Sequence, residues 1–111
     1  EVGVRKTHLD EVGSFYAALK RAHDRAGRAK LWADIEIFSF EGDVYHSALL
    51  PAPFERVQKQ LEAVSPYVEE ILIYEYPGLM NNPGTKAFAG HPSSEQLYTD
   101  YMAYRARQAK L

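Results

Sequence analysis

The chain has 111 residues, of which 46% are hydrophobic and 13% aromatic, which suits one small globular domain and no more. Its net charge of −2, from 13 basic and 15 acidic residues, leaves no basic surface for phosphates and so excludes nucleic acid as a partner. The lack of cysteine excludes disulfides and thiol chemistry, and no apolar run approaches a membrane span or the core of a signal peptide.

An amphipathic helix is predicted over about residues 9–27. Apolar residues recur there at helical spacing, with charged residues between them: Val12, Phe15, Leu19, Ala22 and Ala26. Thr7 or Asp10 is the expected N-cap of this helix. Gly27 follows at the position where a left-handed residue commonly ends a helix.

A strand with two different faces is predicted over about residues 31–38. One face is aliphatic and suits packing beneath helices: Leu31, Ala33, Ile35 and Ile37. The other face alternates aromatic residues and acids: Trp32, Asp34, Glu36 and Phe38. In a closed parallel barrel this second face points inward, where acids near the C-terminal mouth are commonly functional.

The rest of the chain is predicted to contain one more strand between two helices. A loop over residues 39–50 leads to a helix over about 53–65, and a continuous apolar run predicts a strand at 71–76 that is covered on both faces. A loop rich in Gly, Pro and Asn then reaches Pro92. Ser93 and Gln96 form a plausible capping box for a final helix over about 94–109.

This order of elements predicts the fold class and the domain. Two strands joined by one helix are expected to be parallel, and a two-stranded parallel sheet with open edges is a poor domain alone. We therefore expect an α/β chain of the order α-β-α-β-α, which resembles the last third of a (β/α)8 TIM barrel. Residues 1–111 would form a single partial domain that needs the rest of a barrel or a homo-oligomer.

Three segments carry a resemblance to a known family. Gly3-Val4-Arg5-Lys6, residues 31–38 and the run Tyr74-Glu75-Tyr76-Pro77-Gly78-Leu79-Met80-Asn81-Asn82-Pro83 resemble the C-terminal part of a glycoside-hydrolase-like TIM-barrel family. That family is catalogued as a domain of unknown function. The resemblance assigns the three segments to the loop after strand six, to strand seven, and to strand eight with its loop. It implies a carbohydrate ligand, an extracytoplasmic location and no cofactor.

Glu36 and Glu75 are the candidate catalytic pair. Glycoside hydrolysis uses two carboxyl groups, which lie about 5 Å or about 6.5–9.5 Å apart according to the stereochemical outcome. Asp34 would orient a partner of Glu36 or act on it as a like charge. The candidate substrate-binding residues are the aromatic ones that can shape a pocket or stack on a sugar, together with one loop histidine: Trp32, Tyr74, Tyr76 and His46.

Each candidate also has a structural interpretation. Glu36 could be an acid paired inside the protein, Glu75 could be exposed beside buried tyrosines, and Trp32 could belong to the core. His46 and His91 could simply be solvated, and His8 and His23 lack metal-ligand spacing, so no metal site is expected. The competing function is a non-catalytic carbohydrate-binding or structural module. A convergence of the two glutamates in an open cleft would favour catalysis.

Overall fold

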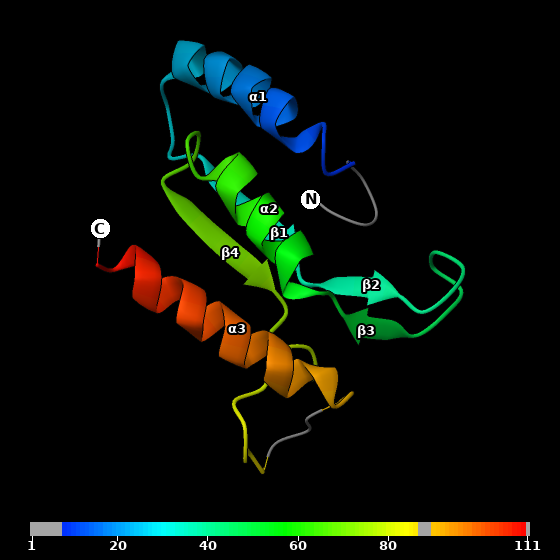
Figure 1. Cartoon of the computed structure of the whole chain (residues 1–111). Coiled ribbons are helices and arrows are strands. Elements are labelled where there is room, and N and C mark those ends of the chain that lie inside the picture. The colour runs from blue at the N-terminus through cyan, green and yellow to red at the C-terminus, as the bar shows by residue number, and fades with distance from the viewer. Residues whose placement is uncertain (1–7, 87–89, 111) are drawn as a thin grey trace. The chain divides into compact units, whose positions relative to one another are not determined.

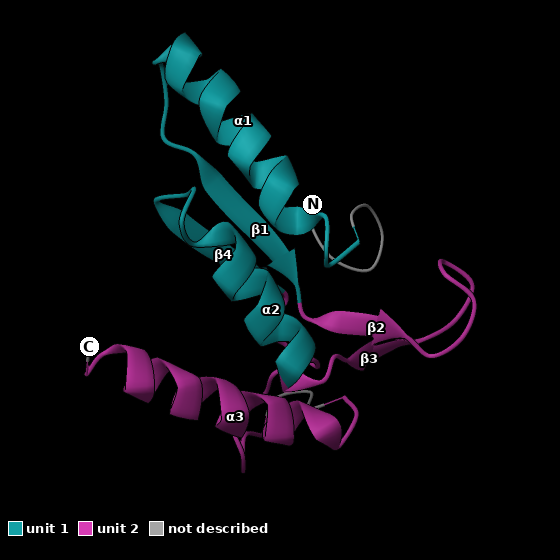
Figure 2. Ribbon diagram, turned by 45° about the horizontal axis from the view of Figure 1, so that its top comes forward, with its two compact units in different colours: residues 1–36, 55–74 teal, residues 37–54, 75–111 magenta. Residues whose placement is uncertain are grey.

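The computed structural model describes residues 8–86 and 90–110, so the Gly3-Val4-Arg5-Lys6 motif and Thr7 lie outside the described residues. Within these described residues, three helices and four strands follow one another (Figure 1). They fall into two compact units, residues 1–36 with 55–74 and residues 37–54 with 75–111, coloured separately in Figure 2.

The first unit is built on a parallel pair of strands. β1 (Trp32–Glu36) lies beside β4 (Glu70–Tyr74), and the register pairs Trp32 with Glu70 and Glu36 with Tyr74. The parallel direction that the sequence predicted is therefore confirmed. Because paired residues of neighbouring strands point to the same side of a sheet, the register fixes which side chains share a face.

The helices α1 (Val12–Ala26) and α2 (Phe54–Val64, whose first residue belongs to the second unit) run alongside these strands in the opposite direction (Figures 1 and 2). The core of the unit combines helix and strand residues that are almost fully buried: Val12, Tyr16, Ala33, Ile35, Val57, Leu61 and Val64. Gly27 ends α1 in the expected left-handed conformation, with φ of 62°. The expected Asp10 cap is not formed, because Glu11 holds the N-cap position.

One face of the strand pair is open, which corrects two expectations. Leu72 and Tyr74 are 51% and 45% exposed, although β4 was expected to be covered on both faces. Trp32 is 52% exposed and so does not belong to the core. The helices cover the face that carries Ala33 and Ile35, and in a barrel the opposite face is covered by side chains of other strands.

The second unit contains a hairpin that was not predicted. β2 (Phe38–Phe40) pairs antiparallel with β3 (Leu49–Pro51), so the segment expected as one strand over residues 31–38 is divided after Glu36. The expected loop over residues 39–50 thus contains most of this hairpin. The apolar and polar alternation continues through Phe38, Ser39 and Phe40, and only pairing with a distant segment reveals where β1 ends.

The second unit ends in α3 (Ser93–Gln108), which contacts β3 and buries Leu97. The Phe54 and Tyr104 rings pack with centroids 5.7 Å apart. The predicted capping box is not formed, because no side chain caps this helix and Ser93 is its first residue. The Ser93 hydroxyl instead contacts His91, as described below.

Candidate functional site

Glu36 is the last residue of β1 and is only 2% exposed. Its backbone carbonyl accepts a hydrogen bond of 2.9 Å from the side-chain amide of Gln60, which is itself completely buried on α2. This bond joins the end of the strand to the helix that packs against it. The backbone of Glu36 is therefore held in place at the carboxyl end of a parallel strand. Catalytic residues of TIM-barrel enzymes lie at such strand ends.

Trp32, Asp34 and Tyr74 lie on the same face of the strand pair as Glu36. The register sets Tyr74 directly opposite Glu36, while Asp34 and Trp32 precede it along β1. Asp34 is exposed, and its negative charge acts on Tyr16 of α1: burial raises the pKa of the Tyr16 hydroxyl, and Asp34 raises it further. The open face therefore presents an indole, a carboxylate and a phenol beside the buried glutamate.

Glu75 is the first residue after β4 and belongs to the second unit. It is exposed, and it lines a pocket of about 430 Å³ within that unit. The other lining residues come from β3, from the loop after β4 and from the segment before α3: Leu49, Leu50, Pro77, Gly78, Leu79, Gly90 and His91. Among the described lining residues, Glu75 and His91 carry the ionisable side chains, and the others are apolar residues or glycines.

The loop after β4 is held by its own side chains. The Gly78 N–H donates to Asn81 Oδ1 at 2.7 Å, and the Asn82 N–H donates to the hydroxyl of Tyr76 at 3.2 Å. The Tyr76 ring also packs edge-on against Tyr98 of α3, with centroids 6.2 Å apart. Tyr76 was expected as a substrate-binding residue, and the structure gives it a part in holding this loop while leaving it 44% exposed.

His46 lies in the hairpin turn between β2 and β3 and is exposed. Ser47 Oγ accepts from the Gly42 N–H and donates to the Asp43 carbonyl, each at 2.9 Å, which closes the turn. Tyr45 has a φ of 67° in this turn and packs edge-on against Phe40. His46 is not among the residues that line the pocket with Glu75.

His91 lines the pocket, although its place in the sequence predicted only a solvated side chain. Its Nδ1 lies 2.7 Å from Ser93 Oγ and accepts the Ser93 N–H at 3.2 Å. Gly90 lies so close to Gly78 that a Cβ on Gly90 would stand 2.3 Å from the Gly78 carbonyl oxygen. The sequence signal was a histidine between a glycine and a helix start, which has no specific meaning without this packing.

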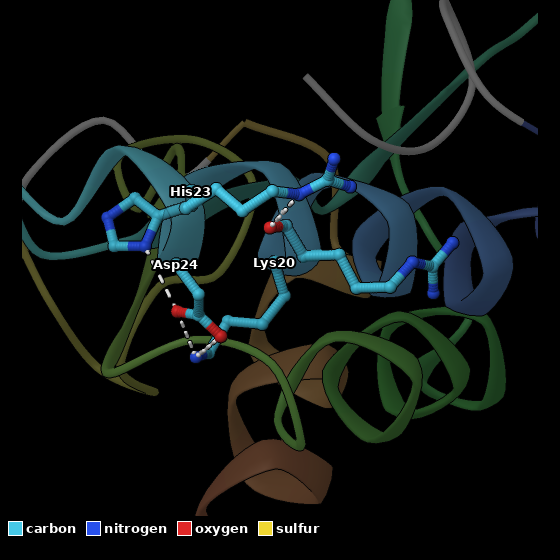
Figure 3. A network of polar contacts seen from close by, with 5 residues as sticks. Lys20, His23 and Asp24 are labelled. Carbon is cyan, nitrogen blue, oxygen red and sulfur yellow. Dashed lines mark hydrogen bonds and ion pairs between the residues drawn. The ribbon is translucent and has the colours of Figure 1, made fainter.

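A network of charged side chains lies on α1. Lys20 contacts both carboxylate oxygens of Asp24, at 2.6 and 2.7 Å, and His23 Nδ1 lies 3.5 Å from the same carboxylate (Figure 3). The Lys20 hydrogen bonds hold the pKa of the Asp24 carboxyl below its usual range, with smaller contributions from His23. Within residues 8–86 and 90–110, no three His, Asp or Glu side chains are grouped to hold a metal ion.

The family follows from the sequence comparison. Residues 1–87 match the family model described as "Domain of unknown function (DUF4434)". The chain belongs to this family. The resemblance noted from the sequence motifs is thereby confirmed, whereas no curated protein sequence matches the chain.

A solved structure shows which fold this member of the DUF4434 family resembles. The chain is similar to a protein from Bacteroides thetaiotaomicron described as a "putative alpha-L-fucosidase", with a TM-score of 0.69 and 22% identity. The match covers 87% of this chain and 28% of that one. At this identity the match shows the fold alone, and it confirms an α/β segment of a TIM barrel. The chain spans about 28% of the length of the larger protein. No helix in the described part of the chain is long and apolar enough to cross a membrane.

Proposed function

We propose that this chain supplies the carboxyl-terminal strands of a glycoside-hydrolase-like barrel, in which Glu36 acts as nucleophile or as general acid and base. The observation that carries the proposal is the position of Glu36, buried at the carboxyl end of β1 with its backbone held by Gln60. A carboxyl group that extends from a backbone position held in this way suits a reaction that needs an accurately placed acid or carboxylate.

Glu75 is the proposed second carboxylate. It follows directly after Tyr74, the residue that the register sets opposite Glu36, and it lines the pocket of the second unit. The exposed aromatic rings of Trp32 and Tyr74 supply flat apolar faces of the kind on which sugar rings stack. Residues 1–111 would then form one partial barrel domain, completed by further strands or by other copies.

Hydrolysis of chromogenic glycosides tests this function. Nitrophenyl α-L-fucosides come first, because the similar bacterial protein carries the fucosidase name, and nitrophenyl glucosides, galactosides and mannosides follow. We expect release of nitrophenol from at least one substrate, and its loss in Glu36→Gln protein. Folded protein that cleaves none of them would contradict the proposal.

The open strand face also supports a second function, non-catalytic binding of carbohydrate. Trp32 and Tyr74 are about half exposed on one face of the sheet, and a binding module needs such rings but no second carboxylate. Isothermal titration with oligosaccharides distinguishes the two functions. Binding that weakens in Trp32→Ala protein, with no cleavage of any nitrophenyl glycoside, would favour the binding module.

A further inference from the structure

The pocket of the second unit combines an apolar lining with two polar groups of opposite hydrogen-bonding character. Leu49 and Leu50 of β3 and Leu79 of the loop after β4 contribute apolar surface. Glu75 and His91 contribute the ionisable side chains. An ionised carboxylate only accepts hydrogen bonds, so a ligand group facing Glu75 must donate.

The contact with Ser93 fixes the hydrogen-bonding role of His91. The backbone N–H of Ser93 can only donate, so Nδ1, which lies 3.2 Å from it, is the accepting nitrogen of the ring. The neutral imidazole therefore carries its proton on Nε2. Ser93 Oγ, 2.7 Å from Nδ1, reinforces this tautomer and holds the orientation of the ring. Nε2–H is then the group that donates to a ligand.

A pyranose ring matches this set of groups. Its C–H face suits the leucines, and its hydroxyls both donate and accept, so that one hydroxyl can donate to Glu75 while another accepts from His91. A purely apolar ligand would leave both polar groups without partners, at a cost in binding free energy. An anionic ligand would be repelled by the Glu75 carboxylate.

We propose that the pocket lined by Glu75 and His91 is a monosaccharide-binding subsite, in which His91 Nε2–H donates to a sugar hydroxyl and Ser93 is the positioning residue. This inference rests on the proposed function, because it takes a carbohydrate as the ligand. It goes beyond that function by adding His91 as a residue that binds the sugar and Ser93 as the residue that favours one tautomer of His91. Sugar binding at the subsite does not require hydrolysis, so measurements of binding affinity alone can test it.

The test is titration of the protein with methyl glycosides of glucose, galactose, mannose and a 6-deoxyhexose. His91→Ala should weaken binding of the preferred glycoside roughly tenfold, which corresponds to about 1.4 kcal/mol. Ser93→Ala should weaken it less, because the backbone N–H of Ser93 remains. His91→Gln keeps a side-chain donor and should restore part of the affinity. His8→Ala, which removes an exposed histidine outside the pocket, is the matched control.

A spectroscopic measurement separates positioning from a general structural effect. The ¹⁵N chemical shifts of His91 should report the Nε2–H tautomer in the wild-type protein, and a smaller excess of the same tautomer in Ser93→Ala protein, where only the backbone N–H still donates to Nδ1. Equal affinity of wild-type and His91→Ala proteins, or no binding of any methyl glycoside, would overturn the subsite. Binding that depends on His91 in a protein that hydrolyses nothing would support the subsite and contradict the proposed catalysis.

Discussion

The side-chain amide of Gln60 donates a 2.9 Å hydrogen bond to the backbone carbonyl of Glu36, and both residues are buried. The bond links the middle of α2 to the end of β1, which are 24 residues apart in the sequence. Backbone carbonyls that are buried away from water need such partners. Gln60 thus satisfies this carbonyl and fixes the point from which the Glu36 side chain begins.

Replacement of Gln60 by methionine keeps the volume of the side chain and removes its donor. The Glu36 carbonyl would then lack this bond, at a cost of about 1–3 kcal/mol. The substitution also removes Gln60 Oε1, a buried oxygen that has no hydrogen-bond partner among the described residues. Removing this unsatisfied atom offsets part of the cost. We expect a net loss of about 1 kcal/mol in the free energy of unfolding, measured by urea denaturation.

The activity of the same variant tests the positioning of Glu36. If Gln60 fixes the backbone of a catalytic residue, Gln60→Met should lower kcat more than it changes KM. Gln58→Met is the matched control, because Gln58 lies on the same helix and its side-chain amide donates to Glu62, four residues further along and not on β1. Equal effects of the two substitutions on kcat would contradict the positioning role.

Gly90 is the position in the pocket wall where a methyl group has no room. Gly90 and Gly84 both have positive φ, at 60° and 77°, so alanine at either should cost about 1 kcal/mol in backbone strain. At Gly90 the new Cβ would stand 2.3 Å from the Gly78 carbonyl oxygen, whereas at Gly84 no atom of the described residues lies within 4 Å. Overpacking should add about 1–3 kcal/mol at Gly90.

Thermal unfolding of the two glycine variants measures this difference. Gly90→Ala should lower the melting temperature clearly more than Gly84→Ala, and it should also weaken sugar binding at the pocket. Similar melting temperatures for the two variants would show that the loop after β4 moves away from Gly90 at little cost.

Tyr16 should make the protein less stable at high pH. Its pKa is raised in the folded state by burial and by the charge of Asp34, so the folded protein holds this proton more tightly than the unfolded chain. Stability from this group is complete below the unfolded pKa of about 10 and is lost as the pH rises through the folded pKa. Tyr16→Phe should therefore lose less melting temperature between pH 7 and pH 11 than wild type. An equal loss would contradict this assignment.

Asp24 should affect the stability of the protein at low pH. Its pKa is lowered by the Lys20 hydrogen bonds, so its contribution is present above the unfolded value of about 3.9 and is lost as the pH falls through the folded pKa. Near neutral pH we expect little change in Asp24→Asn protein, because this exposed acid lies near the C-terminal end of α1, where the helix dipole disfavours it. Its acid-induced unfolding below about pH 4 should be shallower than in wild type.

A double-mutant cycle isolates this pair. If the lowered pKa arises from Lys20, the acid-unfolding curve of Lys20→Gln protein should resemble that of Asp24→Asn, and the double variant should add nothing further. Additive effects of the two substitutions would assign the shift to other charges.

The sequence predicted the parts of the fold that local patterns determine. Apolar runs near Ile35 and Ile73, separated by an amphipathic helix, identified the parallel strands and their order. The same alternation placed Glu36 near the carboxyl end of a strand predicted over residues 31–38, but it did not predict that β1 ends at Glu36. The β2–β3 hairpin was missed because its pairing joins Phe38 to Pro51, and nothing in the local pattern distinguishes Phe38 from a continued strand.

Among the candidate site residues, the sequence predicted those on or next to a strand, and it did not predict the pocket residue His91. His91 becomes meaningful through two contacts, one of its Nδ1 with Ser93 and one of the neighbouring Gly90 with Gly78. The second contact joins segments 12 residues apart through a loop, so no periodicity could signal it. The predicted catalytic roles of Glu36 and Glu75 remain predictions that kinetics must decide.

The measurement that tests the central claim most directly is kcat/KM of Glu36→Gln protein on the best nitrophenyl glycoside. The substitution keeps the size of the side chain and removes its acidity, and Glu62→Gln on the surface of α2 is the control. We predict a fall of about 10²–10⁴-fold for Glu36→Gln with an unchanged circular dichroism spectrum, and no fall for the control. A Glu36→Gln protein that is folded and as active as wild type would contradict the account.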